Sequence, residues 1–152
     1  MTDLTLPKSC KLIRAADRQD GKQGLHYFQG VSANTVGARH LCMHVITVPP
    51  GSRAKVHKHE THETSIYVLS GEAYTLFGDQ LEHAIKSAAG DMLYIPADVP
   101  HLPINLGTEP VIGIVARTDP NEQESLVLLP ELEAAANEAI ENLKHTIQRR
   151  DQ

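Results

Sequence analysis

The chain has 152 residues, a formal net charge of −5, few aromatic residues and no tryptophan. Its length suffices for one domain with a real hydrophobic core. The negative charge and the absence of a long basic run argue against nucleic acid or an anionic membrane surface as the main partner, and scarce aromatic side chains remove the stacking platforms that single-stranded nucleic acid needs.

The cysteines and the apolar runs indicate the cellular compartment. Cys10 and Cys42 are the two cysteines of the chain, and we expect both to be free thiols in a reducing compartment, because their spacing matches no metal motif. The first residues show no basic region followed by a hydrophobic stretch. No apolar run approaches the roughly 20 residues that cross a bilayer. We therefore expect a cytoplasmic protein that does not act at a membrane.

Short strands separated by glycine and proline dominate the pattern up to Thr118, after a loosely held leader over residues 1–9. We expect strands over residues 10–14, 25–29, 39–48, 65–70, 71–77, 81–85, 92–95 and 111–116, and loops over 15–24 and 30–37. The strand at 71–77 is expected to form a hairpin with the strand before it. This spacing favours an all-β sandwich or barrel over a parallel sheet with interleaved helices.

The character of the chain changes after Thr118, which suggests a division into residues 1–118 and residues 119–152. The first part is a β domain with an N-terminal leader strand, and the second is a linker and a C-terminal helix. Pro130 suits the first helical position. One apolar stripe follows the helical period and comprises Leu132, Ala135, Ala136, Ala139, Ile140, Leu143 and Ile147. We expect the helix to bury this stripe on the barrel or on a second subunit.

Three of the nine histidines lie within six positions, shortly before the strand at 65–70. His57 and His59 are two residues apart, so an extended chain directs both imidazoles to one face, roughly 7 Å apart along the strand. Both can therefore bend toward one metal ion. His62 and Glu63 offer a third ligand as the chain returns. Because neighbouring residues of a strand face opposite sides, only one of these two is expected to face inward unless the chain bulges.

A second stretch offers another ligand. Gly90 and Asp91 indicate a turn, and residues 92–95 a short strand. The prolines that follow force an extended segment, which delivers His101 after a tight bend. The sequence therefore places a fourth candidate ligand on a different segment from the first three.

These two stretches resemble the two sequence motifs of the cupin superfamily. The first motif is a glycine, five residues, His-x-His, three or four residues, a glutamate, six residues and a closing glycine. The second is a glycine, five residues, a proline, one residue, a glycine, two residues, a histidine, three residues and an asparagine. The matching residues are Gly51, His57, His59 and Gly71 for the first motif, and Gly90, Pro96, His101 and Asn105 for the second.

The chain departs from these motifs at two positions. Glu63 leaves seven residues before Gly71, so either the strand bulges or Thr64 occupies the usual glutamate position. Asp98 replaces the second glycine of the second motif, and a left-handed turn conformation accepts Asp better than most residues.

The resemblance implies an all-β double-stranded β-helix, a jelly-roll barrel, with a metal ion inside. It also implies three histidines and one carboxylate as ligands: His57, His59, Glu63 and His101, with His62 as the alternative to Glu63. Such a set leaves one or two open positions on one divalent transition metal ion, which is Fe, Mn, Ni or Zn. An open site of this kind polarises a carbonyl oxygen, activates water or binds dioxygen beside a chelating substrate.

Three functions agree with these features. The first is a metal-dependent enzyme of dioxygenase or isomerase/lyase type that acts on a small polar or carbonyl-containing substrate. The second is a non-catalytic module that binds a small ligand or the metal, and the third is an interaction protein that uses its C-terminal helix. A DNA-binding regulator is disfavoured because the chain is too short to add a helix-turn-helix domain. We favour the enzyme and expect a homodimer. The sequence identifies metal ligands but no catalytic residue.

Other polar and aromatic residues have more ordinary expected roles. His44 lies on a strand that lines the barrel, where it contacts substrate or is a satisfied buried histidine. Asn105 is expected to satisfy backbone groups near the turn at His101. The tyrosines at 67, 74 and 94 are expected mostly in the core. The remaining histidines are expected at the surface: His26, His40, His83 and His145.

Overall fold

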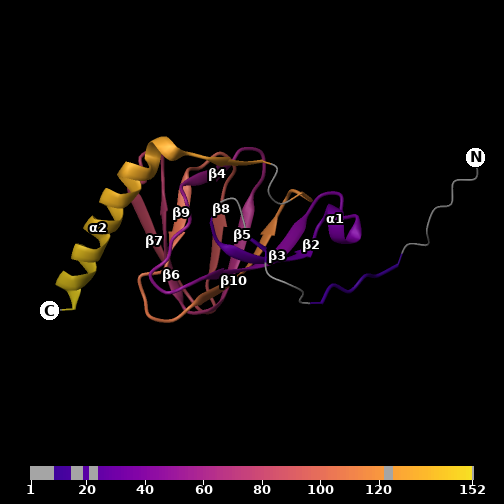
Figure 1. Cartoon of the computed structure of the whole chain (residues 1–152), viewed down its shortest axis with the longest axis horizontal. Helices are drawn as coiled ribbons and strands as arrows, with labels where there is room; N and C mark the ends of the chain where they lie inside the picture. Colours follow the sequence, from indigo (N-terminus) through magenta and orange to yellow (C-terminus); the bar gives the residue numbers. More distant parts are fainter. Residues whose placement is uncertain (1–8, 15–18, 21–23, 122–124, 152) are drawn as a thin grey trace, which may run out of the picture.

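The computed structural model describes residues 9–14, 19–20, 24–121 and 125–151. Two antiparallel β-sheets face each other, and the C-terminal helix α2 (Glu133–Arg150) lies along one side of this sandwich (Figure 1). The architecture is the expected all-β double-stranded β-helix with a C-terminal helix, so the predicted fold class is confirmed.

Within the described residues, the two sheets have six and five strands. In spatial order, the first contains β1 (Gln19–Asp20), β2 (His26–Val31), β3 (Cys42–Val48), β10 (Val111–Arg117), β5 (Thr64–Ser70) and β8 (Met92–Ile95). The second contains β11 (Leu126–Leu128), β4 (His57–His59), β9 (His101–Ile104), β6 (Glu72–Phe77) and β7 (His83–Ala88). The helical elements are α1 (Ala33–Val36), the 3₁₀ turn η1 (Pro130–Leu132) and α2.

The predicted hairpin between residues 65–70 and 71–77 is wrong. Strand β5 pairs with β10 and β8, whereas β6 pairs with β7 and β9 in the other sheet. Only Gly71 separates the two strands, and common hairpin loops need at least about two residues. Gly71 has φ of 80°, and a Cβ there would lie 2.7 Å from the carbonyl oxygen of Pro110. A glycine therefore lets the chain pass from one sheet to the other at this point.

Three smaller expectations are also corrected. Residues 10–14 form no strand, and the predicted loops contain the short strand β1 and the single turn α1, which Ser32 caps. Tyr67 and Tyr94 are 37% and 59% exposed on the outer face of their sheet, because the alternation of β5 and β8 turns them away from the core. The leader over residues 1–8 lies outside the described part of the chain.

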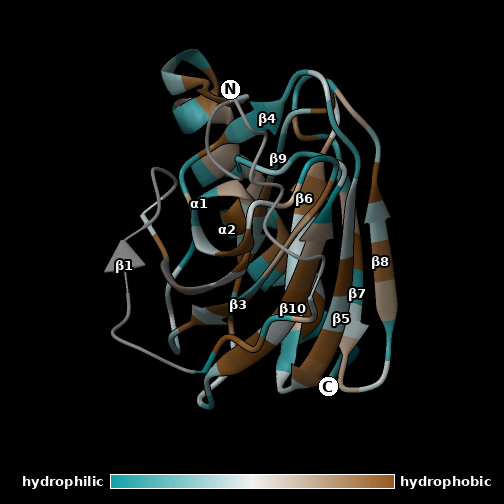
Figure 2. Cartoon of the chain, turned by 90° about the vertical axis from the view of Figure 1, so that its right-hand side faces the viewer, coloured by the Kyte–Doolittle hydropathy of each residue, from teal (hydrophilic) through white to brown (hydrophobic). Residues whose placement is uncertain are grey.

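The hydrophobic core lies between the sheets and continues under α2. Along β10, alternate residues from Val111 to Arg117 are buried, and Figure 2 shows apolar segments along β10 and β6 in the middle of the sandwich. Helix α2 buries Ala136 and Ile140 against this core. The predicted helix and its apolar stripe are therefore confirmed, and the stripe packs on the chain's own barrel.

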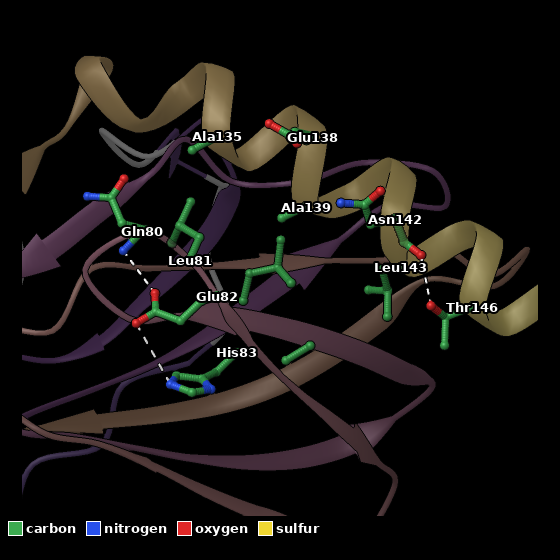
Figure 3. Close-up of a pocket in the computed structure, with 12 residues that line it drawn as sticks. Gln80, Leu81, Glu82, His83, Ala135, Glu138, Ala139, Asn142, Leu143 and Thr146 are labelled. Atoms are coloured by element: carbon green, nitrogen blue, oxygen red, sulfur yellow. Dashed lines mark hydrogen bonds and ion pairs between the residues drawn. The ribbon is translucent and has the colours of Figure 1, made fainter.

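Polar contacts fix the start of α2. The Glu133 carboxylate accepts a hydrogen bond from the backbone N–H of Val56 at 2.8 Å and forms an ion pair with Arg53. Beneath the helix, Leu81 is 1% exposed although its φ is 58°, and Figure 3 shows it under α2. Burial of this leucine offsets the cost of a left-handed backbone at a residue with a side chain.

Candidate metal centre

Strands β4 and β9 bring three histidines together. The two strands are antiparallel, with His57 opposite His101, and His59 lies on the same face of β4 as His57. All three side chains are at most 3% exposed. One nitrogen of each ring lies within 4.8 Å of those of the other two. Three of the four predicted ligands are therefore gathered at one point inside the sandwich.

Backbone carbonyls orient two of the three rings. Nδ1 of His57 lies 2.7 Å from the carbonyl oxygen of Lys55, and Nδ1 of His101 lies 2.8 Å from that of Val99. A carbonyl oxygen only accepts, so each Nδ1 carries the proton and each Nε2 keeps its lone pair. Neutral imidazoles oriented in this way are typical metal ligands.

The third ring, that of His59, has unsatisfied nitrogens. Among the described residues, neither its Nδ1 nor its Nε2 has a hydrogen-bond partner, although the side chain is 2% exposed. Such a buried polar group is costly. A metal ion bound to one of these nitrogens would remove part of this cost, so the donor set fits a transition metal.

The electrostatic environment keeps the cluster neutral. Burial lowers the pKa of His57 to about 4 and that of His101 to about 3, and the Arg117 guanidinium contributes in the same direction. Burial, followed by Arg117, also lowers the pKa of His59 far below its usual range. At neutral pH the three rings therefore need not release protons before they bind a metal ion.

Glu63 and His62, the two alternatives for the remaining ligand, lie on opposite sides of the chain. Glu63 is exposed, and its Oε1 accepts a hydrogen bond from the Tyr94 hydroxyl at 2.7 Å. His62 is buried, with its ring centroid 4.6 Å from that of His59 and its Nδ1 3.1 Å from Oδ2 of Asp119. The structure therefore leaves Glu63 outside the three-histidine group, and strand alternation is the physical reason.

Thr64 takes the inward position that the motif reserves for glutamate. It is 2% exposed, and its Oγ1 accepts a hydrogen bond from Nε of Arg117 at 3.2 Å. Nη1 of Arg117 donates to Nε2 of His44 at 3.3 Å. His44 is thus a buried, hydrogen-bonded histidine, which was one of its two expected roles.

Sequence reasoning missed Arg117. The alternation of buried and less buried residues along β10 could have found it. Every second residue from Val111 faces the core, and continuing this alternation places Arg117 on the same inner face. The predicted strand ended at residue 116, one residue too early.

A small cavity adjoins the histidines. Its volume is about 30 Å³, roughly that of one water molecule. His57, His101, Thr64 and Arg117 line it together with apolar residues from both sheets. A larger groove of about 470 Å³ lies between α2 and the β6–β7 turn (Figure 3), and none of the three clustered histidines lines it.

The turn before His101 and the loop after it are held by polar side chains. Asp98 has φ of 64°, as expected for this left-handed position, and its backbone N–H donates to the carbonyl oxygen of His59 at 2.7 Å. Asn105 is fully buried, and its Nδ2 donates to the carbonyl oxygens of Val48 and Glu109. Asn105 thus satisfies backbone groups, as expected, but these belong to the end of β3 and the loop after β9 and not to the turn before His101.

The remaining histidines and the two cysteines are not part of the three-histidine group. His40, His83 and His145 are exposed, as expected, whereas the side chain of His26 is outside what the structure describes. The structure shows no disulfide between Cys10, which is exposed, and Cys42, which is buried. No helix in the described ranges is long and apolar enough to span a bilayer.

Comparisons with known proteins agree with this architecture. The family model described as "Cupin domain" matches residues 44–116. An uncharacterized protein of Methanocaldococcus jannaschii is 35% identical over 83 residues, which cover 54% of this chain and 63% of that protein. Oxalate decarboxylase OxdC of Bacillus subtilis is 30% identical over 83 residues, or 53% of this chain and 22% of the enzyme. The chain therefore spans less than two thirds of each.

Two kinds of solved structure share the fold. A structure of the Bacillus subtilis oxalate decarboxylase, which has Mn(II) centres, superposes with a TM-score of 0.61 at 23% identity, covering 73% of this chain and 30% of the enzyme. The polyketide cyclase RemF of Streptomyces resistomycificus superposes with a TM-score of 0.64 at 20% identity, covering 80% of this chain and 86% of that one.

Proposed function

Because residues 44–116 form a cupin domain, we propose that the protein is a metal-dependent enzyme acting on a small polar or carbonyl-containing substrate, by dioxygenase or isomerase/lyase chemistry. The observation that carries this proposal is the buried three-histidine group, whose ligand atoms lie within 4.8 Å of one another. The alternative, a non-catalytic module that holds a ligand or the metal, uses the same residues and differs in the absence of turnover.

In this proposal, His57, His59 and His101 hold one divalent transition metal ion, either Fe, Mn, Ni or Zn. The Mn(II) centres of the structurally similar oxalate decarboxylase support Mn as the first candidate. When bound, the ion supplies a Lewis acid that polarises a substrate oxygen. The chain's own residues hold the imidazoles through the carbonyls of Lys55 and Val99, and the apolar lining excludes water from the site.

A pair of substitutions tests whether Glu63 or His62 acts as a fourth ligand of the metal ion. We expect Glu63→Gln to leave the metal dissociation constant within about twofold of the parent value, because the Glu63 carboxylate is engaged with Tyr94 at the surface. We expect His62→Gln to weaken metal binding by about tenfold. His62 packs on the ring of His59, and residues that hold a metal ligand in place raise the metal affinity by about 10- to 100-fold. Competitive titration with a chromogenic chelator measures both. Loss of metal in Glu63→Gln alone would instead identify the carboxylate as a ligand.

Turnover that depends on the metal tests the enzyme proposal. Because the relative OxdC acts on oxalate, oxalate and other small oxoacids form the first substrate panel. We expect turnover to fall at least a hundredfold on chelation and to return on adding back the ion, with oxygen uptake separating dioxygenase from isomerase/lyase chemistry. The surface variant His145→Ala is the control. Ligand-dependent stabilisation without turnover for any substrate would favour the binding module.

The oligomeric and cellular context completes the proposal. The outer face of the six-stranded sheet exposes apolar side chains on the neighbouring strands β5 and β8, namely Tyr67, Leu69, Met92 and Tyr94. Contiguous apolar surface of this kind marks interfaces, and a second copy of the chain is the proposed occupant, as a homodimer. We propose the cytoplasm as its location, because Cys10 and Cys42 form no disulfide with each other.

A further inference from the structure

We propose that the ligand of this centre is an amphipathic acid: its apolar group, about the size of a benzene ring, occupies a pocket between β7 and β8, and its carboxylate reaches toward His101 and Arg117. This inference rests on the proposed function, because it names the substrate class of the same site.

The pocket lies at the open side of the sandwich. Strand β7 is the edge of one sheet and β8 is the edge of the other. The pocket between them has a volume of about 160 Å³ and a mainly apolar wall, to which Phe77, Ile85, Leu93, Ile95 and Val99 contribute. An engineered apolar cavity of about 150 Å³ takes up benzene. The volume and the lining therefore fit an aromatic ring or a branched alkyl group.

This outer pocket is adjacent to the small cavity at the histidines. Three side chains, those of Thr75, Ile95 and His101, line both spaces. His101 therefore lies at the junction between the metal centre and the apolar pocket. A ligand whose apolar group fills the outer pocket has its other end directed past Ile95 toward the three-histidine group.

The inner end of this path favours negative charge. Arg117 is 6% exposed and lines the inner cavity together with His57 and His101. Among the described residues, none of those that line the cavity is an aspartate or glutamate. A planar guanidinium matches the geometry of a carboxylate, and a divalent cation at the histidines would add to the attraction. Thr64 and His44 fix the orientation of this guanidinium.

The rim of the outer pocket is also ordered. Tyr94 is among the residues that line the pocket, and its hydroxyl donates to the carboxylate of Glu63, which immediately precedes β5. This hydrogen bond ties β8 to the residue that precedes β5, and so fixes the strand that carries Leu93 and Ile95. By contrast, the 470 Å³ groove beside α2 is not lined by any of the clustered histidines, so it offers no such combination.

Binding of phenylacetate to the zinc-loaded protein tests the inference without any assay of activity. Isothermal titration calorimetry compares phenylacetate with acetate, which has only the acidic head, and with benzyl alcohol, which has only the apolar ring and a neutral hydroxyl. We expect phenylacetate to bind at least tenfold more tightly than either. Equal affinities for phenylacetate and acetate would overturn the inference.

A pair of tryptophan substitutions on β8 locates the ring. Leu93→Trp fills the outer pocket and is expected to weaken phenylacetate at least tenfold while acetate binding stays within twofold. Met92→Trp is the matched control, because Met92 is the preceding residue, is 79% exposed and is not among the pocket's lining residues. If both variants weaken phenylacetate equally, or neither does, the outer pocket is not the site.

The metal-free protein separates this inference from the proposed function. The protein could fail to hold any metal and still bind phenylacetate in a way that Leu93→Trp blocks. This result would support the proposed ligand pocket and contradict the proposed metal-dependent enzyme. Metal-dependent turnover on substrates without an apolar group, with no preference for phenylacetate, would support the enzyme and contradict the pocket.

Discussion

Replacement of His59 by alanine is expected to reduce the bound transition metal from near one equivalent to less than about a tenth, with an affinity loss of more than about 100-fold. His59 has both ring nitrogens buried without a hydrogen-bond partner among the described residues, so a bound ion is the partner that its position requires. His57→Ala and His101→Ala should have similar effects, because the same three ligand atoms form one group. Element analysis of protein purified without an affinity tag measures the loss.

The control for these variants is His145→Ala, which removes an exposed histidine on α2. Far-UV circular dichroism should show that all four variants keep the sheet structure. Metal content that is unchanged in His59→Ala would contradict the ligand set. Loss of metal from His145→Ala to the same extent would show that the ion binds non-specifically to surface histidines.

The metal-free protein is expected to lose stability as the pH falls below about 6.5. Burial lowers the pKa of His44 and of His101 to about 3 and that of His57 to about 4. The unfolded chain, in which these groups have their ordinary pKa of about 6.5, therefore binds more protons than the folded protein in this range. The stabilisation is complete above pH 6.5 and is lost as the pH falls toward the folded pKa values.

At pH 5 each of these three histidines lowers the free energy of unfolding by about 2 kcal/mol relative to pH 7, or about 6 kcal/mol together, and His59 acts in the same direction. Urea unfolding of the chelated protein at the two pH values measures the difference. His44→Leu removes one titrating group and should reduce the difference by about 2 kcal/mol. A free energy of unfolding that is equal at pH 7 and pH 5 would contradict the buried, neutral histidines.

The strands could be predicted from the sequence because their signals are local. Residues 92–95 are bounded by a Gly-Asp turn and a proline, and the structure has β8 over the same residues. The pairing of the strands is not local. Gly71 looks like a hairpin turn in the sequence, yet the hydrophobic faces of β5 and β6 are buried in two different sheets, which only the closed sandwich determines.

Part of the site could also be predicted from the sequence. The His-x-His spacing and the proline-rich turn before His101 identified three side chains that the fold brings together. The choice between Glu63 and His62 depended on where β5 begins, because a shift of one residue exchanges the inner and outer faces. Arg117 lay beyond the predicted end of its strand, and a lone arginine after an apolar run has no sequence signature of a buried group.

The most direct measurement of the metal centre is an anomalous difference map from crystals of the protein, collected at the absorption edge of the element that element analysis identifies. We predict one peak in the barrel, within about 2.0–2.3 Å of a nitrogen of each of His57, His59 and His101. An occupied peak elsewhere, with no density among these three rings in fully metal-loaded crystals, would contradict the account.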